Sequence, residues 1–441
     1  MRWLVLPLLF ATAPVALSPA LAQQTPLSPR PLGVPPAVNP PPPPVASPPV
    51  RPGPAARAVP APVAAGLAQD LEAALEIDAV ARGLAAQRDA VRARDAQVRS
   101  PIAGSPAIGG SFRADTRGVN RAREWDVEIG APLWLPGQRS ALAGTVEAGV
   151  AEQARRLALR RLEVAALLRD AYWAVGLAEA ELAVARDRLA TARDVARDLD
   201  RRAALGDISA TDALLGRNEV LSAELELARA EAARETARAA YATLTGGSVT
   251  ALAGIRPEAP ARSAEDHPAL VAAEAALATA EAQSRLVAAT PIDNPEVGLF
   301  TRRQGGNLTE DGYSFGIRLR VPLPTDARNT PRRAEAEAGR TRASADLAQA
   351  RRTVQGEIAL ARVALNAAEA ERRLAAQRKA VADQQLAASR AAFRAGEIGA
   401  FDLFRVRQLQ IEAQAADARA VVAAGRARSR LNQAMGAVPG G

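Results

Sequence analysis

Few residues of this chain carry side chains that could do chemistry. Its 441 residues include no Cys and one His, His267. These counts exclude disulfides, thiolate metal sites, a Cys nucleophile and any site built from several His. No Gly-rich loop that could hold a phosphate stands between a strand and a helix. We therefore expect no enzyme, no cofactor and no metal site, and we expect His267, beside Pro268, to be exposed in a linker.

The charged residues indicate solvated helix surfaces. Lys and Arg number 56 against 48 Asp and Glu, a net charge of +8, and Lys379 is the only Lys. Arg alternates with Asp and Glu, as over residues 186–200, without a sustained basic run. This pattern is typical of helices laced with ion pairs and argues against a nucleic-acid partner.

The N-terminus reads as an export signal followed by a linker. Arg2, an apolar stretch from Leu4 and the small residues Ala20 to Ala22 predict a signal peptide over residues 1–22. Residues 23–64 are predicted to be a disordered linker, because 16 of the 32 prolines lie between Pro26 and Pro62. After the signal, no apolar stretch is long enough for a transmembrane helix.

The rest of the chain contains the same unit twice, with an offset of 190 residues. Residues 206–212 (GDISATD) match residues 396–402 (GEIGAFD), and residues 132–133 match 322–323. The first copy is predicted over 65–247, with a hairpin at 106–134 and a turn at 205–212. A linker follows at 248–264. The second copy spans 265–436, with a hairpin at 295–323 and a turn at 395–402, before a tail at 437–441.

Helices dominate each copy. We expect them at 66–98, 138–204 and 211–245, and again at 265–290, 330–394 and 400–436. The two longest have about 65 residues, roughly 100 Å at 1.5 Å per residue, a length that suits a coiled coil. Two heptad rows support this interpretation: Val175, Leu182, Leu189, Ala196 and Ala203, with Ala178, Ala185, Ala192 and Leu199.

In the two predicted hairpins the helical spacing of apolar residues gives way to a period of two. Apolar residues alternate with polar ones, and the predicted membrane-facing set is Trp125, Val127, Ile129, Phe315, Ile317 and Leu319. Such alternation over about ten residues is typical of a transmembrane β-strand with a lipid face and a lumen face. A hairpin packed on a helix is the alternative. Charges on the polar face and Trp134 near a strand end favour the membrane interpretation.

Four strands are too few to close a barrel, and an open strand edge is not tolerated in lipid. The chain must then assemble from more than one copy. The predicted fold class is mainly α with a small β-barrel part. Duplicated helix–hairpin–helix units form a long coiled-coil α-barrel, continued by a transmembrane β-barrel that the copies share.

These features resemble the outer-membrane factor family, the TolC-like exit ducts of tripartite efflux and type I secretion systems. The resemblance covers about residues 66–436. It implies a homotrimer in the outer membrane with a long periplasmic portion, an inner-membrane pump and a periplasmic adaptor protein as partners. The repeated turns look like the family's periplasmic helix tips, which implies adaptor contacts at Leu205, Gly206, Asp207, Ala395, Gly396 and Glu397.

The resemblance also implies a constricted periplasmic entrance, to which we assign Asp402, Arg405 and Asp212. Arg405 stands where some members have a second Asp, and Phe393 and Ile398 replace a Tyr and an Arg of the best-known gate. The strand-to-helix corners 132–139 and 322–329 look like those of the metal-cation, CzcC-like branch. If metal cations are the cargo, the pump selects them.

The sequence therefore predicts a passive outer-membrane exit duct for efflux, with heavy-metal cations as one cargo class. An exit duct for type I protein secretion and a periplasmic structural coiled coil are the alternatives. The adaptor itself is disfavoured, because an adaptor has one long hairpin between β-rich domains. The structural coiled coil leaves the period-two strands unexplained.

Overall fold

A computed structural model describes residues 62–118, 121–261, 266–306 and 309–440. The predicted signal peptide and residues 23–61 of the predicted linker lie outside them. Helix α1 begins at Pro62, so residues 62–64 belong to a helix and not to the linker. The corrected start of the ordered fold is therefore Pro62.

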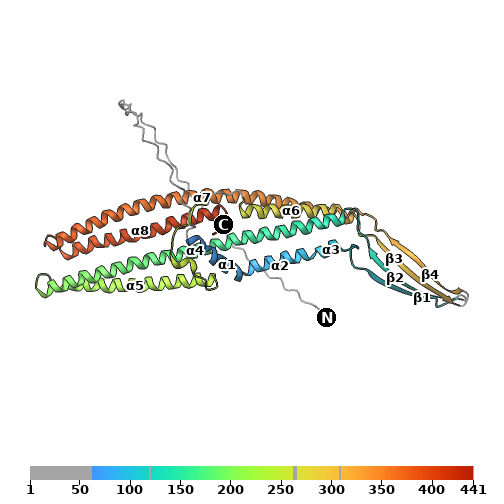
Figure 1. Cartoon of the computed structure of the whole chain (residues 1–441), viewed down its shortest axis with the longest axis horizontal. Coiled ribbons are helices and arrows are strands. Elements are labelled where there is room, and N and C mark those ends of the chain that lie inside the picture. Colours follow the sequence, from blue (N-terminus) through green and yellow to red (C-terminus); the bar gives the residue numbers. More distant parts are fainter. Residues whose placement is uncertain (1–61, 119–120, 262–265, 307–308, 441) are drawn as a thin grey trace, which may run out of the picture. The chain divides into compact units, whose positions relative to one another are not determined.

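The elements follow the predicted order of helix, hairpin, long helix, turn and helix, twice over (Figure 1). The first set is α1 (Pro62–Ile77), α2 (Ala79–Ala93), α3 (Asp95–Arg99), β1 (Ala107–Ala114), β2 (Ala122–Pro132), α4 (Gln138–Ala204) and α5 (Ala210–Leu244). After the 3-10 helix η1 (Thr250–Ala253), the second set is α6 (Pro268–Ala288), β3 (Glu296–Gly306), β4 (Thr309–Arg320), α7 (Asp326–Arg394) and α8 (Ala400–Ala434).

The single helix expected over 66–98 is wrong. The segment forms three helices. Asp78 separates α1 from α2 and caps α2 by accepting a hydrogen bond from the backbone nitrogen of Ala81 at 2.7 Å. A second break at Arg94 separates α2 from α3. The helix expected from 330 begins four residues earlier, with Pro331 inside α7. Across the parts of the chain that the structure describes, no helix has the length and apolar character needed to cross a bilayer.

The four strands form one antiparallel sheet in the order β1-β2-β3-β4. The hairpin of each copy is β1–β2 or β3–β4, and the two hairpins join through β2 and β3, where Gly130 pairs with Gly298. Within this sheet, β1 and β4 each have a partner on one side only. The sheet therefore has two open edges.

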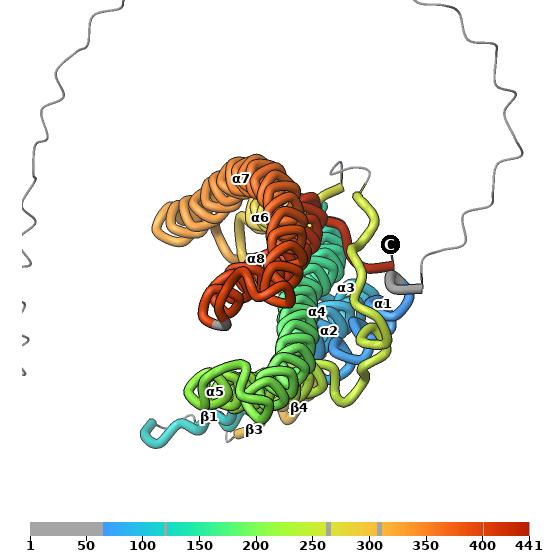
Figure 2. Tube along the Cα trace, turned by 90° about the vertical axis from the view of Figure 1, so that its left-hand side faces the viewer, coloured from blue at the N-terminus to red at the C-terminus, as the bar shows by residue number. Residues whose placement is uncertain are grey.

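The helices form a layer in which α4 is central. In its C-terminal half, towards the turn, α4 contacts α5 on one side and α8 on the other, and α7 packs on α8 (Figure 2). Towards the strands, α4 contacts α2 and α6, and α6 contacts α7. The order of the half that ends in the turns is thus α5-α4-α8-α7, which leaves α5 and α7 at the two edges.

The main core lies at the middle of α4, where α1 and η1 pack on it. Leu67 and Leu71 of α1 are fully buried against Leu168 and Tyr172 of α4. The η1 turn, inside the predicted linker 248–264, contributes Leu252 to this core. The first copy is therefore thickened here by a segment for which the sequence predicted no structure.

A buried carboxylate fixes this segment. Asp70 accepts hydrogen bonds from the Tyr241 hydroxyl at 2.7 Å and from the backbone nitrogens of Thr250 and Ala251 at 3.1 and 2.8 Å, and also from the Ser248 hydroxyl. Burial would raise the pKa of Asp70, but these hydrogen bonds outweigh burial and hold its pKa below the usual value. Asp70 is therefore ionised and ties α1 to the end of α5 and to η1.

Candidate functional site

One face of the sheet is apolar and uncovered. The six residues predicted to face the membrane all lie on it, between 53% and 82% exposed: Trp125, Val127, Ile129, Phe315, Ile317 and Leu319. The strand register places Ile129, Leu299 and Ile317 side by side, so the apolar row crosses from one hairpin to the other. At the far end of the strands, Phe112 packs against Trp125 with ring centroids 4.5 Å apart and ring planes tilted by 42°.

The opposite face carries paired charges. Asp126 on β2 accepts a hydrogen bond from Arg302 Nε on β3 at 2.7 Å, and Glu128 on β2 pairs with Arg318 on β4. The acids come from the first hairpin and the bases from the second, so the ion pairs join the two copies. The Arg318 guanidinium also lies 5.1 Å from the ring centroid of Phe300, a large apolar residue on this polar face.

The alternation of residue types in the sequence did not predict that Phe300 lies on the polar face. Gly316, which has no side chain, leaves space for its ring. A Cβ atom at Gly316, the cross-strand neighbour of Phe300, would come within 2.5 Å of the Phe300 ring. Alternation also did not place Arg303, which shares the apolar side with Tyr313 and lies 5.7 Å from its ring centroid. Both depend on cross-strand register, which the sequence does not give.

The two turns between helices have the same backbone. Gly206 (φ 81°) and Gly396 (φ 76°) adopt the left-handed conformation that other residues resist. The nitrogens of Asp207 and Glu397 donate to the carbonyl oxygens five residues earlier, each at 2.9 Å. This is the Schellman arrangement that ends a helix. Leu205 is exposed beside the first glycine, as is Ala395 beside the second.

The caps after these turns differ. Ser209 and Asp212 form a capping box: the Ser209 hydroxyl accepts from the Asp212 nitrogen at 3.2 Å, and the Asp212 carboxylate accepts from the Ser209 nitrogen at 3.3 Å. At the start of α8 the equivalent residue is Gly399, which has no side chain to offer. Asp212, assigned to the entrance from sequence, therefore serves as a local cap.

Asp402 and Arg405 lie together on an exposed face of the first turns of α8. Among the described residues neither has an ion pair within 4.0 Å. Phe393 and Ile398 belong instead to a small apolar cluster with Leu199 and Leu403. The Arg202 guanidinium lies 4.6 Å from the Phe393 ring centroid, so Phe393 helps to hold the two tips together.

The prediction that His267 is exposed is wrong. Its side chain is 4% exposed, because α6 starts beside it and Gly436 packs against its ring. His267 Nδ1 accepts from the nitrogen of Ala269 at 3.1 Å and so caps α6. Burial lowers the pKa of His267, which agrees with this neutral cap. Within the described ranges no three His, Asp or Glu gather as a metal site would require.

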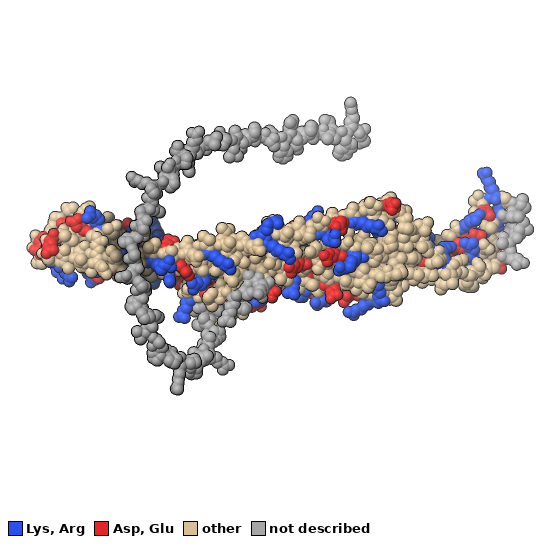
Figure 3. All heavy atoms as spheres, turned by 90° about the horizontal axis from the view of Figure 1, so that it is seen from above, with Lys and Arg blue, Asp and Glu red and all other residues tan. Residues whose placement is uncertain are grey.

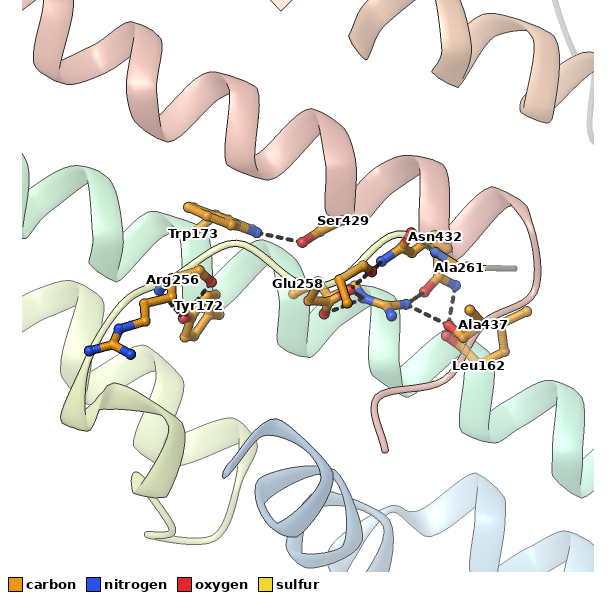
Figure 4. Close-up of polar contacts among 12 residues, drawn as sticks. Leu162, Tyr172, Trp173, Arg256, Glu258, Ala261, Ser429, Asn432 and Ala437 are labelled. Carbon is orange, nitrogen blue, oxygen red and sulfur yellow. Dashed lines mark hydrogen bonds and ion pairs between the residues drawn. The ribbon is translucent and has the colours of Figure 1, made fainter. Parts of the chain in front are cut away.

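A buried polar cluster joins the two copies at the middle of α4 (Figure 4). Arg169 Nε donates to both oxygens of Glu258, at 2.9 and 3.1 Å, and its Nη1 donates to the carbonyl oxygen of Ala437 at 3.0 Å. Asn432 Nδ2 also donates to Glu258, and Trp173 Nε1 donates to Ser429 Oγ at 2.9 Å. We call this set, with Gln433, the polar clasp.

The polar clasp corrects the predicted tail at 437–441. The carbonyl of Ala437 is bound to Arg169, and Val438 packs against the main core. Arg169 and Glu258 have side chains only 5% and 8% exposed, so each requires the other as a partner. The last described residues are therefore part of the fold.

Charges of both signs are mixed over the helices. On the face drawn in Figure 3, Lys and Arg alternate with Asp and Glu without a continuous patch of one sign. Ion pairs between neighbouring helices account for many of these charges, such as Arg188 with Glu219 at 3.0 Å and Arg419 with Glu181 at 2.9 Å. This surface is the ion-pair-laced one that the sequence predicted.

Comparison with known proteins now adds to this geometry. Residues 259–437 match the family model described as outer membrane efflux protein. The match includes the second copy of the repeated unit and stops short of the first. The comparison with curated protein sequences found no match.

Solved structures show the same fold over most of the chain. A membrane protein from Pseudomonas aeruginosa matches with a TM-score of 0.68 and 20% identity, over 85% of this chain and 90% of that one. The outer membrane protein VceC from Vibrio cholerae matches with a TM-score of 0.66 and 18% identity, over 85% and 96%. CusC, described for its folding and transmembrane channel formation, gives a TM-score of 0.66 and 16% identity, over 85% and 92%.

Proposed function

We propose that this chain is the passive outer-membrane exit duct of a tripartite efflux system. The observation that supports it best is the sheet, whose apolar face is exposed across both hairpins while the other face holds paired charges. Lipid would cover the first face and water would fill the space beside the second. The fold shared with outer membrane channels and the family match over residues 259–437 point the same way.

The duct forms when several copies close a ring. In lipid the open edges of β1 and β4 need hydrogen-bond partners, and each supplies what the other lacks. Three copies, the number that the resemblance to TolC-like ducts suggests, give twelve strands, above the minimum of about eight for a closed membrane barrel. The helices continue the wall on the periplasmic side.

The turns at 205–212 and 395–402 form the periplasmic end. We assign adaptor contact to Leu205, Gly206 and Asp207 and to Ala395, Gly396 and Glu397, and assign the entrance to Asp402 and Arg405, with Asp212 as a cap beside it. Rings of Asp402 and Arg405 stacked one turn apart would oppose each other's charge. The entrance would then favour cations less than one lined by acids alone.

The duct needs no catalysis and no cofactor, because an inner-membrane pump linked by the adaptor supplies the energy. The corners 132–139 and 322–329 resemble those of the CzcC-like branch, which makes heavy-metal cations the first cargo class to test. We assign metal selection to the pump, since the described residues offer no cluster of ligands.

Single-channel conductance of the purified protein in a planar bilayer tests this function. We expect stable conductance steps from the unmodified chain and none from Leu319→Arg, because an Arg near mid-bilayer costs about 2–4 kcal/mol. The matched control is Arg318→Leu on the neighbouring position of the same strand, which should insert and conduct.

A closed duct would insert without conducting, so heat-modifiable oligomers are followed in the same samples. Loss of oligomers and conductance in Arg318→Leu but not in Leu319→Arg would mean that the faces are reversed. A monomer that never enters the bilayer would overturn the proposed function.

A further inference from the structure

A buried arginine near the start of α8 has no acidic partner in the described part of the chain. Arg407 is 3% exposed, and its Nη2 donates to the carbonyl oxygen of Arg188 on α4 at 2.9 Å. Its Nη1 is also buried and has no hydrogen-bond acceptor among the described residues, none of whose carboxylates lies within 4.0 Å of it. A buried cation normally has an anion beside it, because an unpaired one costs free energy.

A polar groove between α4, α7 and α8 lies beside this guanidinium. Its volume is about 350 Å³, and Arg407 lines it together with Arg390 of α7. Burial lowers the pKa of Arg407, and the positive charges of Arg390 and Arg188 lower it further, while Glu219 and Asp187 oppose them. Since a water takes about 30 Å³ in the liquid, the groove has room for a small anion and several waters.

The two acids that line the groove are bound to other groups. Asp187 accepts a hydrogen bond from Gln414 Nε2 at 2.8 Å. Asp383 accepts from Lys379 Nζ and from Gln410 Nε2, each at 2.8 Å. These acids are thus occupied, and within the described ranges neither Arg407 nor its neighbour on α7 has an ion pair.

The first copy of the repeated unit shows what this arginine pairs with. Subtracting 190 turns Arg407 into Arg217 of α5 and turns Arg390 into Asp200 of α4. Arg217 Nε donates to Asp200 Oδ1 at 3.1 Å, between the two helices that meet at the first turn. In the second copy an arginine therefore stands where the first copy supplies the acid.

The two copies also differ in how far this position is buried. The side chains of Arg217 and Asp200 are 65% and 41% exposed, so that water could replace either partner at little cost. Arg407 is covered by α4, through the contact between the two copies. Burial has thus been added at the position where the acid has been replaced, which makes a counterion necessary.

We propose that this groove binds a small oxyanion, of the sulfate, phosphate or carboxylate type, between Arg407 and Arg390. A guanidinium presents its donors in a planar fork that fits two oxygens of such an anion. Arg407 Nη1 is the donor fixed by burial, and Arg390, which is exposed, completes the site from the solvent side. The ion would tie α7 and α8 to α4. The site lies within one chain, so it does not depend on the proposed function.

Equilibrium dialysis of the full chain in detergent against radiolabelled sulfate tests the site. We expect saturable binding of a single ion per chain. Arg407→Met should weaken this binding by about 10- to 100-fold, as expected when a hydrogen bond between charged groups is lost. The matched control is Arg217→Met, at the equivalent position of the first copy, which should bind sulfate as the unmodified chain does. Equal binding by Arg407→Met would place the ion elsewhere and overturn the proposal.

Arg390→Asp gives a second measurement, in which the expected change in stability is a gain. It places in the second copy the acid of the first, so it should abolish sulfate binding and raise the midpoint of thermal unfolding in sulfate-free buffer. Sulfate should raise the midpoint of the unmodified chain and leave that of Arg390→Asp unchanged, because a ligand stabilises the folded state that binds it. Sulfate binding that survives in Arg390→Asp would contradict the assignment.

Competition with unlabelled anions defines the class of ligand. Displacement of the label by phosphate alone would narrow the site to tetrahedral oxyanions, and displacement by acetate as well would extend it to carboxylates; both results support the site. Chloride at equal ionic strength should displace little. Equal displacement by chloride would mean charge screening only and would overturn the proposal.

The assembled protein gives the last control. Binding that is present in monomers and lost in oligomers would mean that an acid of a second copy fills the groove, and the proposal would fail. A folded chain that binds no sulfate in either state would also overturn it. Conductance measured on the same samples would be unaffected by these outcomes, so the proposed function is tested separately.

Discussion

The two helix tips have the same turn and different caps. In both, a left-handed glycine ends the long helix and an Asp follows six residues later, at 212 or 402. Ser209 completes a capping box with Asp212, whereas the equivalent Gly399 leaves Asp402 without that partner. The two tips therefore share one backbone conformation, but only Asp212 is held in a capping box, and the carboxylate of Asp402 makes no such bond.

This difference separates structure from function within a duplicated motif. Asp212 is accounted for by the hydrogen bonds it makes at the start of α5. Asp402 contributes at most its favourable position in the first turn of α8, and it remains available to solvent, to ions or to another copy. Seven substitutions in four groups test this division, in order of expected effect.

The left-handed glycine that both tips share should be equally sensitive to substitution in each. We expect Gly206→Val and Gly396→Val each to destabilise its tip by about 1–2 kcal/mol, because a side chain in the left-handed region is strained. Hydrogen exchange of the amides around each turn measures this. A large effect at one tip and none at the other would mean that the two turns are not equivalent.

Loss of the Ser209 cap at the start of α5 should have the next largest effect on stability. Ser209→Ala should cost about 1 kcal/mol, since it removes the acceptor for the Asp212 nitrogen. Ser209→Gly, which copies the second tip, should cost only a few tenths of a kcal/mol. Exchange of the first amides of α5 distinguishes the two variants, and equal losses would argue against the capping box.

The carboxylates should rank in opposite orders in two measurements. Asp212→Asn should lower the local stability of α5 by about 0.5 kcal/mol through the lost charge at the helix start, with little change in ion selectivity. Asp402→Asn should lower the cation preference measured by reversal potential and leave exchange in α8 nearly unchanged. A selectivity change from Asp212→Asn alone would reverse the assignment.

The smallest effect is a gain. Gly399→Ser restores the missing half of the capping box beside Asp402, and we expect it to stabilise the start of α8 by a few tenths of a kcal/mol. Slower exchange of the Asp402 amide would report the new hydrogen bond. An unchanged rate would show that the second tip cannot adopt the geometry of the first.

The sequence predicted the long elements well, because their signals are local and repeated. Helix α4 spans the predicted residues 138–204, and the strands alternate as their side chains require. Asp78 is a cap that the sequence displayed before Ala79, yet the Ala-rich pattern on either side suggested one continuous helix. Local signals thus gave the long elements, but they missed the two breaks within 66–98, the short η1 helix and the exact start of α7.

What the sequence could not give depends on contacts between distant residues. His267 is buried because Gly436 packs on it, and the chain positions involved are far apart. The polar clasp needs Glu258 and Asn432 to meet Arg169, and neither residue stands out in its own neighbourhood. Phe300 faces the polar side through strand register. Asp402 is different, because the Gly399 that leaves it without a capping partner is visible in the sequence beside it.

The polar clasp also makes the middle of α4 depend on residues far along the chain. Trp173 and Arg169 find partners at Ser429, Gln433 and Ala437, more than 250 residues later. Without residues 429–437, the Arg169 guanidinium loses two hydrogen-bond acceptors, Gln433 and Ala437, and Trp173 loses Ser429. A variant that lacks residues 429–437 would therefore carry an open clasp, in which Trp173 and Arg169 have lost these partners.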